Sequence, residues 1–241
     1  LNEKKEITQE FVQPTGWSSV DTAEEIHQKL ELAGINLSDD SSCCVATGYG
    51  RISVPYADKT VTEITCHALG AVHLFQQPDL TVIDIGGQDT KIIQIEQGFV
   101  KDFIMNDKCA AGTGRFLEVM ANTLSLHPNK MFDLARLGSD TTISSMCTVF
   151  AESEVIGLIG KGEPKENIAY AVVNSTIRKV AAQVSRMNGE MSTFCLTGGL
   201  CECEYIREAL SKELGKEVIS CPDARYAGAI GAALSAMKIR K

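Results

Sequence analysis

The sequence predicts an α/β protein of two coupled lobes, and three observations carry that prediction. Residues 79–105 have the pattern of three short strands in a meander, residues 113–187 have helical spacing, and a second buried strand at 193–196 ends in Thr-Gly-Gly. The first 78 residues repeat part of this order of strands and helices. A length of 241 residues fits two small lobes, since one domain usually takes about 100 to 200 residues.

The second lobe is expected over residues 79–241. An apolar strand at 80–85 ends in two glycines, and two alternating segments then meet at a Gln97-Gly98 turn, which is typical of a hairpin. Apolar residues at helical spacing predict the helices that follow. The expected elements are strands at 80–85, 91–96, 99–105, 193–196 and 218–219, and helices at 113–124, 149–159, 166–187, 204–214 and from 227 onward.

Residues 1–78 are expected to form a partial first lobe. The pattern predicts strands at 7–12 and 43–47 and helices at 22–32 and 60–75. By internal symmetry with the turn at Gln97-Gly98, a glycine-bearing strand is expected ahead of Leu1. We therefore expect this lobe to lack its opening strands and the chain to be a fragment.

Composition and charge exclude several classes of protein. With 44% hydrophobic and 22% charged residues the chain has globular composition, and a net charge of −8 argues against a nucleic-acid binder. No apolar stretch approaches the roughly 18 residues of a membrane span, and the start has no secretory pattern, so we expect a cytoplasmic protein. Nine cysteines in such a chain indicate metal binding or redox chemistry rather than disulfides.

Residues 84–91 (DIGGQDTK) have the features of a phosphate-binding turn. Asp84 ends a strand, and Gly86 and Gly87 follow it in a tight turn. Glycines let backbone amides approach phosphate oxygens, and a carboxylate can hold Mg²⁺ through water. The alternative is a strand that turns on two glycines beside a solvated aspartate.

A second glycine turn, Thr197-Gly198-Gly199, would let an adenosine lie against the backbone. This motif is weak by itself. Its pairing with the first turn strengthens it, as do the small residues at 228–233, which we expect to let the last helix pack close to a sheet.

Two cysteines stand just ahead of predicted helices. Cys109 lies in 106–115 (NDKCAAGTGR) and Cys147 in 144–150 (SSMCTVF). Helix N-termini favour thiolates, but a cubane iron-sulfur cluster usually needs four, so a symmetric dimer would have to share one cluster on its axis. By spacing alone, two ordinary buried cysteines are the alternative. The other seven, expected to have structural roles, are Cys43, Cys44, Cys66, Cys195, Cys201, Cys203 and Cys221.

Taken together, five segments resemble the BadF/BadG/BcrA/BcrD ATPase family, and within it the activators of 2-hydroxyacyl-CoA dehydratases. They are 47–51 (TGYGR), 84–91, 106–115, 147–155 (CTVFAESEV) and 197–199. The resemblance implies two ribonuclease-H-like lobes of the actin/hexokinase/heat-shock chaperone (ASKHA) superfamily, with ATP and Mg²⁺ in the cleft between them. Family members open with an acidic phosphate loop, and this sequence begins after that point.

The resemblance also implies roles for single residues. Asp84 and Gln88 are expected to act in ATP hydrolysis, and Glu152 to contact the ribose. Cys109 and Cys147 from each subunit of a homodimer would hold one [4Fe-4S] cluster. The residues expected to bind the nucleotide are Asp84, Gly86, Gly87, Gln88, Glu152, Gly198 and Gly199.

The implied function is that of an ATP-dependent one-electron donor to a dehydratase or reductase component. Ferredoxin or flavodoxin would reduce the cluster, and neither nucleic acid nor a membrane is an expected partner. Two alternatives remain open: a small-molecule (sugar) kinase of the same superfamily, and a nucleotide-sensing regulatory subunit. Neither requires a cysteine at both helix starts.

Overall fold

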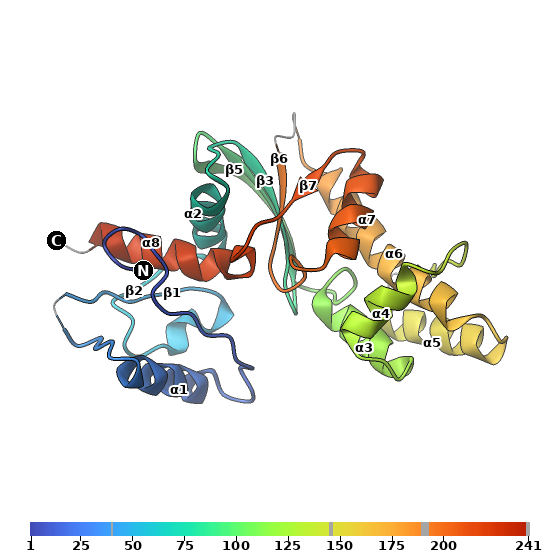
Figure 1. Ribbon diagram of the computed structural model, residues 1–241, viewed down its shortest axis with the longest axis horizontal. Helices are drawn as coiled ribbons and strands as arrows, with labels where there is room; N and C mark the ends of the chain where they lie inside the picture. The colour runs from blue at the N-terminus through green and yellow to red at the C-terminus, as the bar shows by residue number, and fades with distance from the viewer. Residues whose placement is uncertain (40, 145–146, 189–192, 240–241) are drawn as a thin grey trace. The chain divides into compact units, whose positions relative to one another are not determined.

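The computed structural model describes residues 1–39, 41–144, 147–188 and 193–239. The chain divides into two compact units (Figure 1): unit 1 is Leu1–Gln77 with the segment from Tyr226 onward, and unit 2 is Pro78–Arg225. The first division lies within one residue of the expected boundary after residue 78. The closing helix, which the sequence assigned to the second lobe, packs instead within unit 1.

Unit 1 contains three helices and little sheet. Helix α1 is capped by Ser18, whose hydroxyl accepts a hydrogen bond from the Asp21 amide, and its His27 ring stacks on Tyr56. Strands β1 and β2 are parallel and two residues long. The bounds in unit 1 are α1 Ser19–Leu32, β1 Val45–Ala46, β2 Lys59–Thr60, α2 Glu63–Phe75 and α8 Ala227–Ile239, with a short 3-10 helix at Tyr49–Ser53.

Two expected strands of unit 1 differ from the prediction. Residues 7–12 form no strand, and the strand expected at 43–47 is reduced to Val45–Ala46. A strand exists only where a neighbour completes its hydrogen-bond ladder. Within the described chain, no segment pairs with residues 7–12.

Helices α2 and α8 pack so closely that no side chain fits at Gly70 or Gly231. A Cβ on Gly70 would stand 1.9 Å from the Ala227 carbonyl oxygen, and one on Gly231 would stand 1.7 Å from the Cys66 carbonyl oxygen. The small residues of α8 were expected to pack against a sheet. They pack against a helix instead, because the face that α2 offers is equally small.

Unit 2 is built on a five-stranded mixed sheet with strand order β5-β4-β3-β6-β7. The meander β3-β4-β5 is antiparallel, whereas β6 runs parallel to β3 and β7 parallel to β6. Gln97 and Gly98 form the hairpin turn with φ of 53° and 80°. The strands are β3 Leu80–Ile85, β4 Thr90–Glu96, β5 Phe99–Asn106, β6 Thr193–Thr197 and β7 Val218–Ile219, which confirms the predicted α/β pattern.

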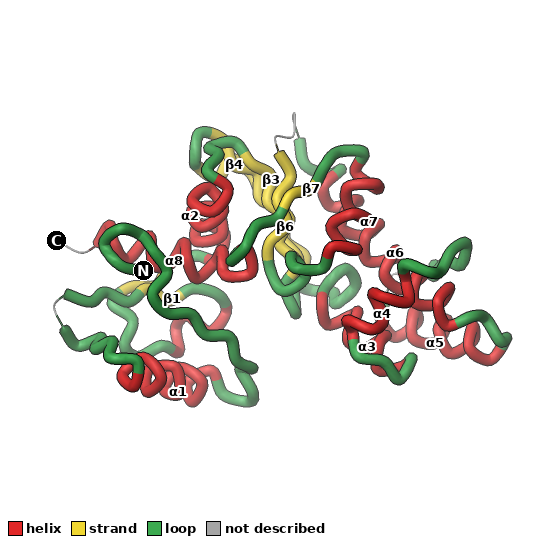
Figure 2. The backbone as a smooth tube through the Cα atoms, in the orientation of Figure 1, coloured by secondary structure: helices red, strands yellow, loops and turns green. Residues whose placement is uncertain are grey.

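Helices follow the meander as predicted, with one addition. The long α6 packs against α4 and α7, and Figure 2 shows α7 beside β7. The helices are α3 Gly114–Thr123, α4 Pro128–Ala135, α5 Thr148–Gly160, α6 Lys165–Val184 and α7 Glu204–Leu214. Sequence reasoning assigned no element to α4. None of the helices in the described residues is long and apolar enough to cross a membrane.

We predict that Gly231→Ala lowers the free energy of unfolding of unit 1 by about 2 kcal/mol, because overpacking forces backbones apart. The new methyl group would meet the Cys66 carbonyl oxygen of α2. The measurement is thermal unfolding followed by circular dichroism. Gly157→Ala in α5 is the matched control, since its Cβ would meet nothing within 4 Å and alanine favours a helix. Equal melting temperatures for the two variants would contradict the packing argument.

Candidate functional site

The two glycine turns lie at one edge of the sheet in unit 2. Strands β3 and β6 are parallel neighbours, with Asp84 in register with Thr197. The turn at 86–87 begins two residues after Asp84, and the turn at 198–199 directly follows Thr197. Ligands of open α/β sheets bind outside the carboxyl ends of the strands. The structure therefore brings together the residues that the sequence proposed for the two halves of a nucleotide site.

Asp84 is the central side chain of this edge and is only 2% exposed. Its Oδ1 accepts a hydrogen bond of 2.8 Å from the Thr197 hydroxyl, and its Oδ2 lies 3.4 Å from the Lys91 ammonium. Lys91 and Thr197 are the cross-strand partners of Asp84 on β4 and β6. The three side chains thus form one row across three strands.

Only glycine fits at position 198, next to the row of Lys91, Asp84 and Thr197. Gly198 has φ of +83°, and a Cβ there would stand 2.6 Å from the Ile85 carbonyl oxygen and 2.9 Å from Asp84 Oδ1. The left-handed backbone and the close approach both exclude other residues. The second glycine turn is thereby pressed against the end of the strand that carries Asp84.

The first glycine turn is braced by α3. The Gly86 amide donates to the Asp89 carbonyl at 2.9 Å, which closes the turn. The amides of Gly114 and Arg115, at the start of α3, donate to the carbonyls of Gly86 and Gly87 at 2.9 and 2.8 Å. Gln88 is exposed on this turn, where it is accessible to a ligand.

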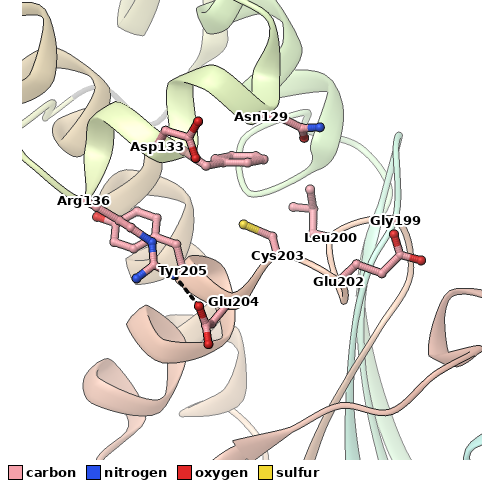
Figure 3. Close-up of a pocket in the computed structure, with 10 residues that line it drawn as sticks. Asn129, Asp133, Arg136, Gly199, Leu200, Glu202, Cys203, Glu204 and Tyr205 are labelled. Atoms are coloured by element: carbon pink, nitrogen blue, oxygen red, sulfur yellow. Dashed lines mark hydrogen bonds and ion pairs between the residues drawn. The ribbon is translucent and has the colours of Figure 1, made fainter.

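A pocket of about 410 Å³ opens beside Gly199 (Figure 3). Arg136 crosses one side, where it forms ion pairs of 3.1 Å with Glu204 and 3.0 Å with Glu208 and lies over the Tyr205 ring. The Cys203 thiol lines the pocket, and burial raises its pKa, so it is a neutral group. The lining residues are Asn129, Phe132, Asp133, Arg136, Gly199, Leu200, Glu202, Cys203, Glu204 and Tyr205.

Sequence reasoning missed the wall of this pocket that α4 supplies. Asn129 and Asp133 lie on α4, which has Pro128 in its first turn and buries Met131 and Phe132. Proline at the first helical position followed by apolar residues one turn apart is a start signal that would have identified the helix.

The loop that carries Cys109 is fixed to the sheet by two side chains. The Asn106 amide donates to the carbonyls of Cys109 and Ala111, both at 2.9 Å. The Thr90 hydroxyl donates to the Gly112 carbonyl at 2.6 Å. Since Asn106 ends β5 and Thr90 begins β4, Cys109 is held on a defined loop.

Cys147 is exposed and is the N-cap residue of α5. Ahead of it, the Ser144 amide donates to Glu154 of the same helix at 3.0 Å. Residues 145–146 of the predicted motif lie outside the described residues. Ala111, Gly112, Ile143 and Ser144 line one pocket of about 330 Å³, so the two cysteine-bearing segments are neighbours in unit 2. Among the described residues no three potential ligands gather as a metal site, but a site with two ligands from each chain would form no such group.

Glu152 is placed differently from the other predicted nucleotide contacts. It accepts a 3.1 Å hydrogen bond from the Thr123 hydroxyl, which ties α5 to α3. Glu152 is not among the described residues that line the pocket beside Gly199. A ribose contact by Glu152 stays a prediction.

Burial raises the pKa of several of the other cysteines. It raises the pKa of Cys195 to about 12 and those of Cys44 and Cys201 to about 11. It also raises the pKa of Cys66 and Cys221. Thiols with raised pKa stay protonated at neutral pH and are poor nucleophiles and ligands.

Comparison with known proteins places these features in one family. The sequence pattern of the BadF/BadG/BcrA/BcrD ATPase family matches residues 1–236. The chain is 44% identical over 243 residues to the (R)-2-hydroxyglutaryl-CoA dehydratase activating ATPase of Acidaminococcus fermentans, covering 99% of this chain and 91% of that protein.

Two solved structures share the fold. One is the crystal structure of Acidaminococcus fermentans (R)-2-hydroxyglutaryl-CoA dehydratase component A, with a TM-score of 0.89 and 42% identity over 100% of this chain and 92% of that chain. The other is the activator of the 2-hydroxyisocaproyl-CoA dehydratase from Clostridium difficile with bound ADPNP. Its TM-score is 0.82, with 34% identity over 95% of this chain and 83% of that chain.

We predict that iodoacetamide at about pH 8 modifies Cys147 in the folded, metal-free protein and leaves Cys195 and Cys201 intact. With pKa values of about 12 and about 11, only about one molecule in 10⁴ or 10³ carries the thiolate at these two positions. Raising the pH should expose Cys201 to reaction before Cys195. Peptide mass spectrometry measures each site, and unfolded protein is the control in which all nine cysteines react. Equal alkylation rates at Cys147, Cys195 and Cys201 in folded protein would contradict the effect of burial on Cys195 and Cys201.

Proposed function

The chain belongs to the BadF/BadG/BcrA/BcrD ATPase family, and we propose that it is an ATP-dependent activator of a 2-hydroxyacyl-CoA dehydratase or a related reductase. The observation that carries the proposal is the edge of unit 2, where the Asp84 turn and the Gly198 turn meet beside a pocket. Two of the relatives named above are described as an activating ATPase or activator of such a dehydratase, and one of these two holds ADPNP.

Each part of the nucleotide has a matching feature. The exposed Gly86-Gly87-Gln88 turn offers backbone to the phosphate tail, and the pocket beside Gly199 offers space for the nucleoside. Gln88 would orient the attacking water, since an amide can donate to it and accept from it. ATP hydrolysis is thus assigned to Asp84 and Gln88, and the products are ADP and phosphate.

Asp84 fits an indirect role toward Mg²⁺. Its carboxylate is buried and already accepts from Thr197 and lies against Lys91, so a metal ion would be held through water rather than by direct contact. Mg²⁺ usually keeps several waters and binds through one or two carboxylates together with phosphate oxygens. When bound, it would neutralise charge on the phosphate tail.

The cysteine pair fits a cluster shared between two copies of the chain. Cys109 and Cys147 lie on neighbouring segments, and two apolar residues shortly after Cys147 are exposed, Val149 by 67% and Phe150 by 66%. Exposed apolar groups beside an exposed ligand favour a subunit contact. When bound by these four thiolates of a homodimer, a [4Fe-4S] cluster would carry one electron from ferredoxin or flavodoxin to the dehydratase component.

A short path of hydrogen bonds would couple the nucleotide to the cluster ligands. The Gly86 and Gly87 carbonyls accept from the first amides of α3, and that helix follows Cys109 by five residues. A phosphate that moves the turn would therefore move the loop of Cys109. The coupling requires ATP and ADP to differ in their contacts with this turn.

We predict that Asp84→Asn lowers the rate of Mg-ATP hydrolysis by about 100-fold, the loss expected when a charged group of an active site is neutralised. Iron and sulfide content should stay unchanged, because Asp84 is not a cluster ligand. Both are measured on anaerobically purified protein. Asp102→Asn on β5, an exposed aspartate of the same sheet, is the matched control. Loss of iron with unchanged hydrolysis would refute the assignment.

We predict that Cys109→Ser and Cys147→Ser each abolish the cluster, because symmetry removes two of the four thiolates of the dimer at once. Dimerisation should weaken as well, since a bound metal stabilises the assembled state by mass action. Iron analysis and native mass spectrometry under strict exclusion of oxygen test both effects, with Cys43→Ser as the control. A Cys109→Ser protein that keeps its full cluster would rule out the bridging arrangement, and a colourless wild-type chain that phosphorylates a sugar would favour a kinase.

A further inference from the structure

Lys91 is an ammonium group enclosed at the nucleotide edge of unit 2. The residue is 1% exposed, and lysine is almost never fully buried unless it is paired. Its Nζ lies 2.8 Å from Asp89 Oδ2 and 3.4 Å from Asp84 Oδ2. Both carboxylates are themselves buried, with 8% and 3% of their side chains exposed.

The two carboxylates belong to different parts of the site. Asp84 lies in strand β3 and is pinned to β6 through Thr197. Asp89 lies in the glycine turn, where its carbonyl accepts from the Gly86 amide and its Oδ1 would stand 2.8 Å from a Cβ on Gly86. Lys91 therefore joins the strand to the turn by charge, in addition to the backbone hydrogen bond from the Gly86 amide to the Asp89 carbonyl.

Removing the ammonium would place two buried carboxylates against each other. Like charges in a buried site repel, and the repulsion would push the turn that carries Asp89 away from the strand that carries Asp84. The backbone of Gly86 and Gly87 would move with it. A displacement of about 1 Å in a catalytic arrangement can cost about 100-fold in rate.

We propose that Lys91 is a positioning residue of the nucleotide site, and that its ammonium holds the glycine turn at the place where the phosphate tail is hydrolysed. The inference rests on the proposed ATP hydrolysis. A loss of Lys91 should affect ATP hydrolysis and nucleoside binding differently, because Asp84, Asp89 and Lys91 do not line the pocket beside Gly199. Nucleoside binding should survive the loss of Lys91, whereas turnover should not.

The experiment measures kcat and KM for Mg-ATP, and ADP binding by calorimetry, in the full chain. Lys91→Met should lower kcat by about 100-fold while the affinity for ADP changes by less than about 5-fold. Lys91→Arg keeps the charge and should recover at least about 10-fold of the lost rate. The double variant Lys91→Met, Asp89→Asn should exceed Lys91→Met in rate, because it removes one of the repelling charges.

A purely structural role predicts a different pattern. The decrease in kcat would then follow the decrease in melting temperature, and adding Asp89→Asn to Lys91→Met would lower both further. Wild-type kcat in Lys91→Met would overturn the positioning role alone; if that variant does not fold, a folded double variant whose affinity for ADP falls as much as its kcat would overturn it equally. A wild-type protein that neither binds nor hydrolyses ATP would overturn the proposed function and this inference together.

Discussion

The parallel pairing of β3 with β6 is the constraint on which the candidate site depends. Its register places Asp84 opposite Thr197, and the glycine turns begin two residues after Asp84 and one residue after Thr197. Side chains alternate along a strand, so a slip of one residue would turn Asp84 away from the Thr197 hydroxyl. It would also move Gly198 from the only place where its backbone can lie against the Ile85 carbonyl. One strand pairing thus assembles residues that are more than a hundred positions apart.

Local signals explain why most of unit 2 could be predicted. The run at 80–85 ends at two glycines, and the Gln97-Gly98 turn joins two strands that are adjacent in the sequence. Prediction failed where an element depends on a distant partner. Residues 7–12 have a strand pattern but no neighbouring strand in the described chain, and α8 has a small face that could meet either a sheet or a helix. Sequence pattern cannot identify that partner.

The features of the candidate site also fall into those that local sequence predicts and those that depend on distant residues. Glycine turns and cysteines ahead of helices can be recognised from a single segment, and the structure brings both turns to one edge. The burial of Lys91 between Asp84 and Asp89 could not be foreseen, because a lysine after a turn is normally solvated. The side of the pocket that Arg136 forms was not predicted. Arg136 follows the short helix α4, and its ion-pair partners Glu204 and Glu208 lie on α7, far along the chain. Long-range charge pairing leaves no periodic trace in the sequence.

The route of the chain through its two units has a consequence for biosynthesis. Unit 2 is one continuous segment, 78–225, whereas unit 1 needs residues from both sides of it. Domains generally fold as units while the chain is being made from its N-terminus. Every strand and turn of this sheet edge is therefore translated before α8, and unit 2 needs no residue of α8 to complete its sheet. Until α8 is made, the face of α2 around Cys66 and Gly70 has no helix to cover it, so a nascent chain would expose an apolar helix face in unit 1.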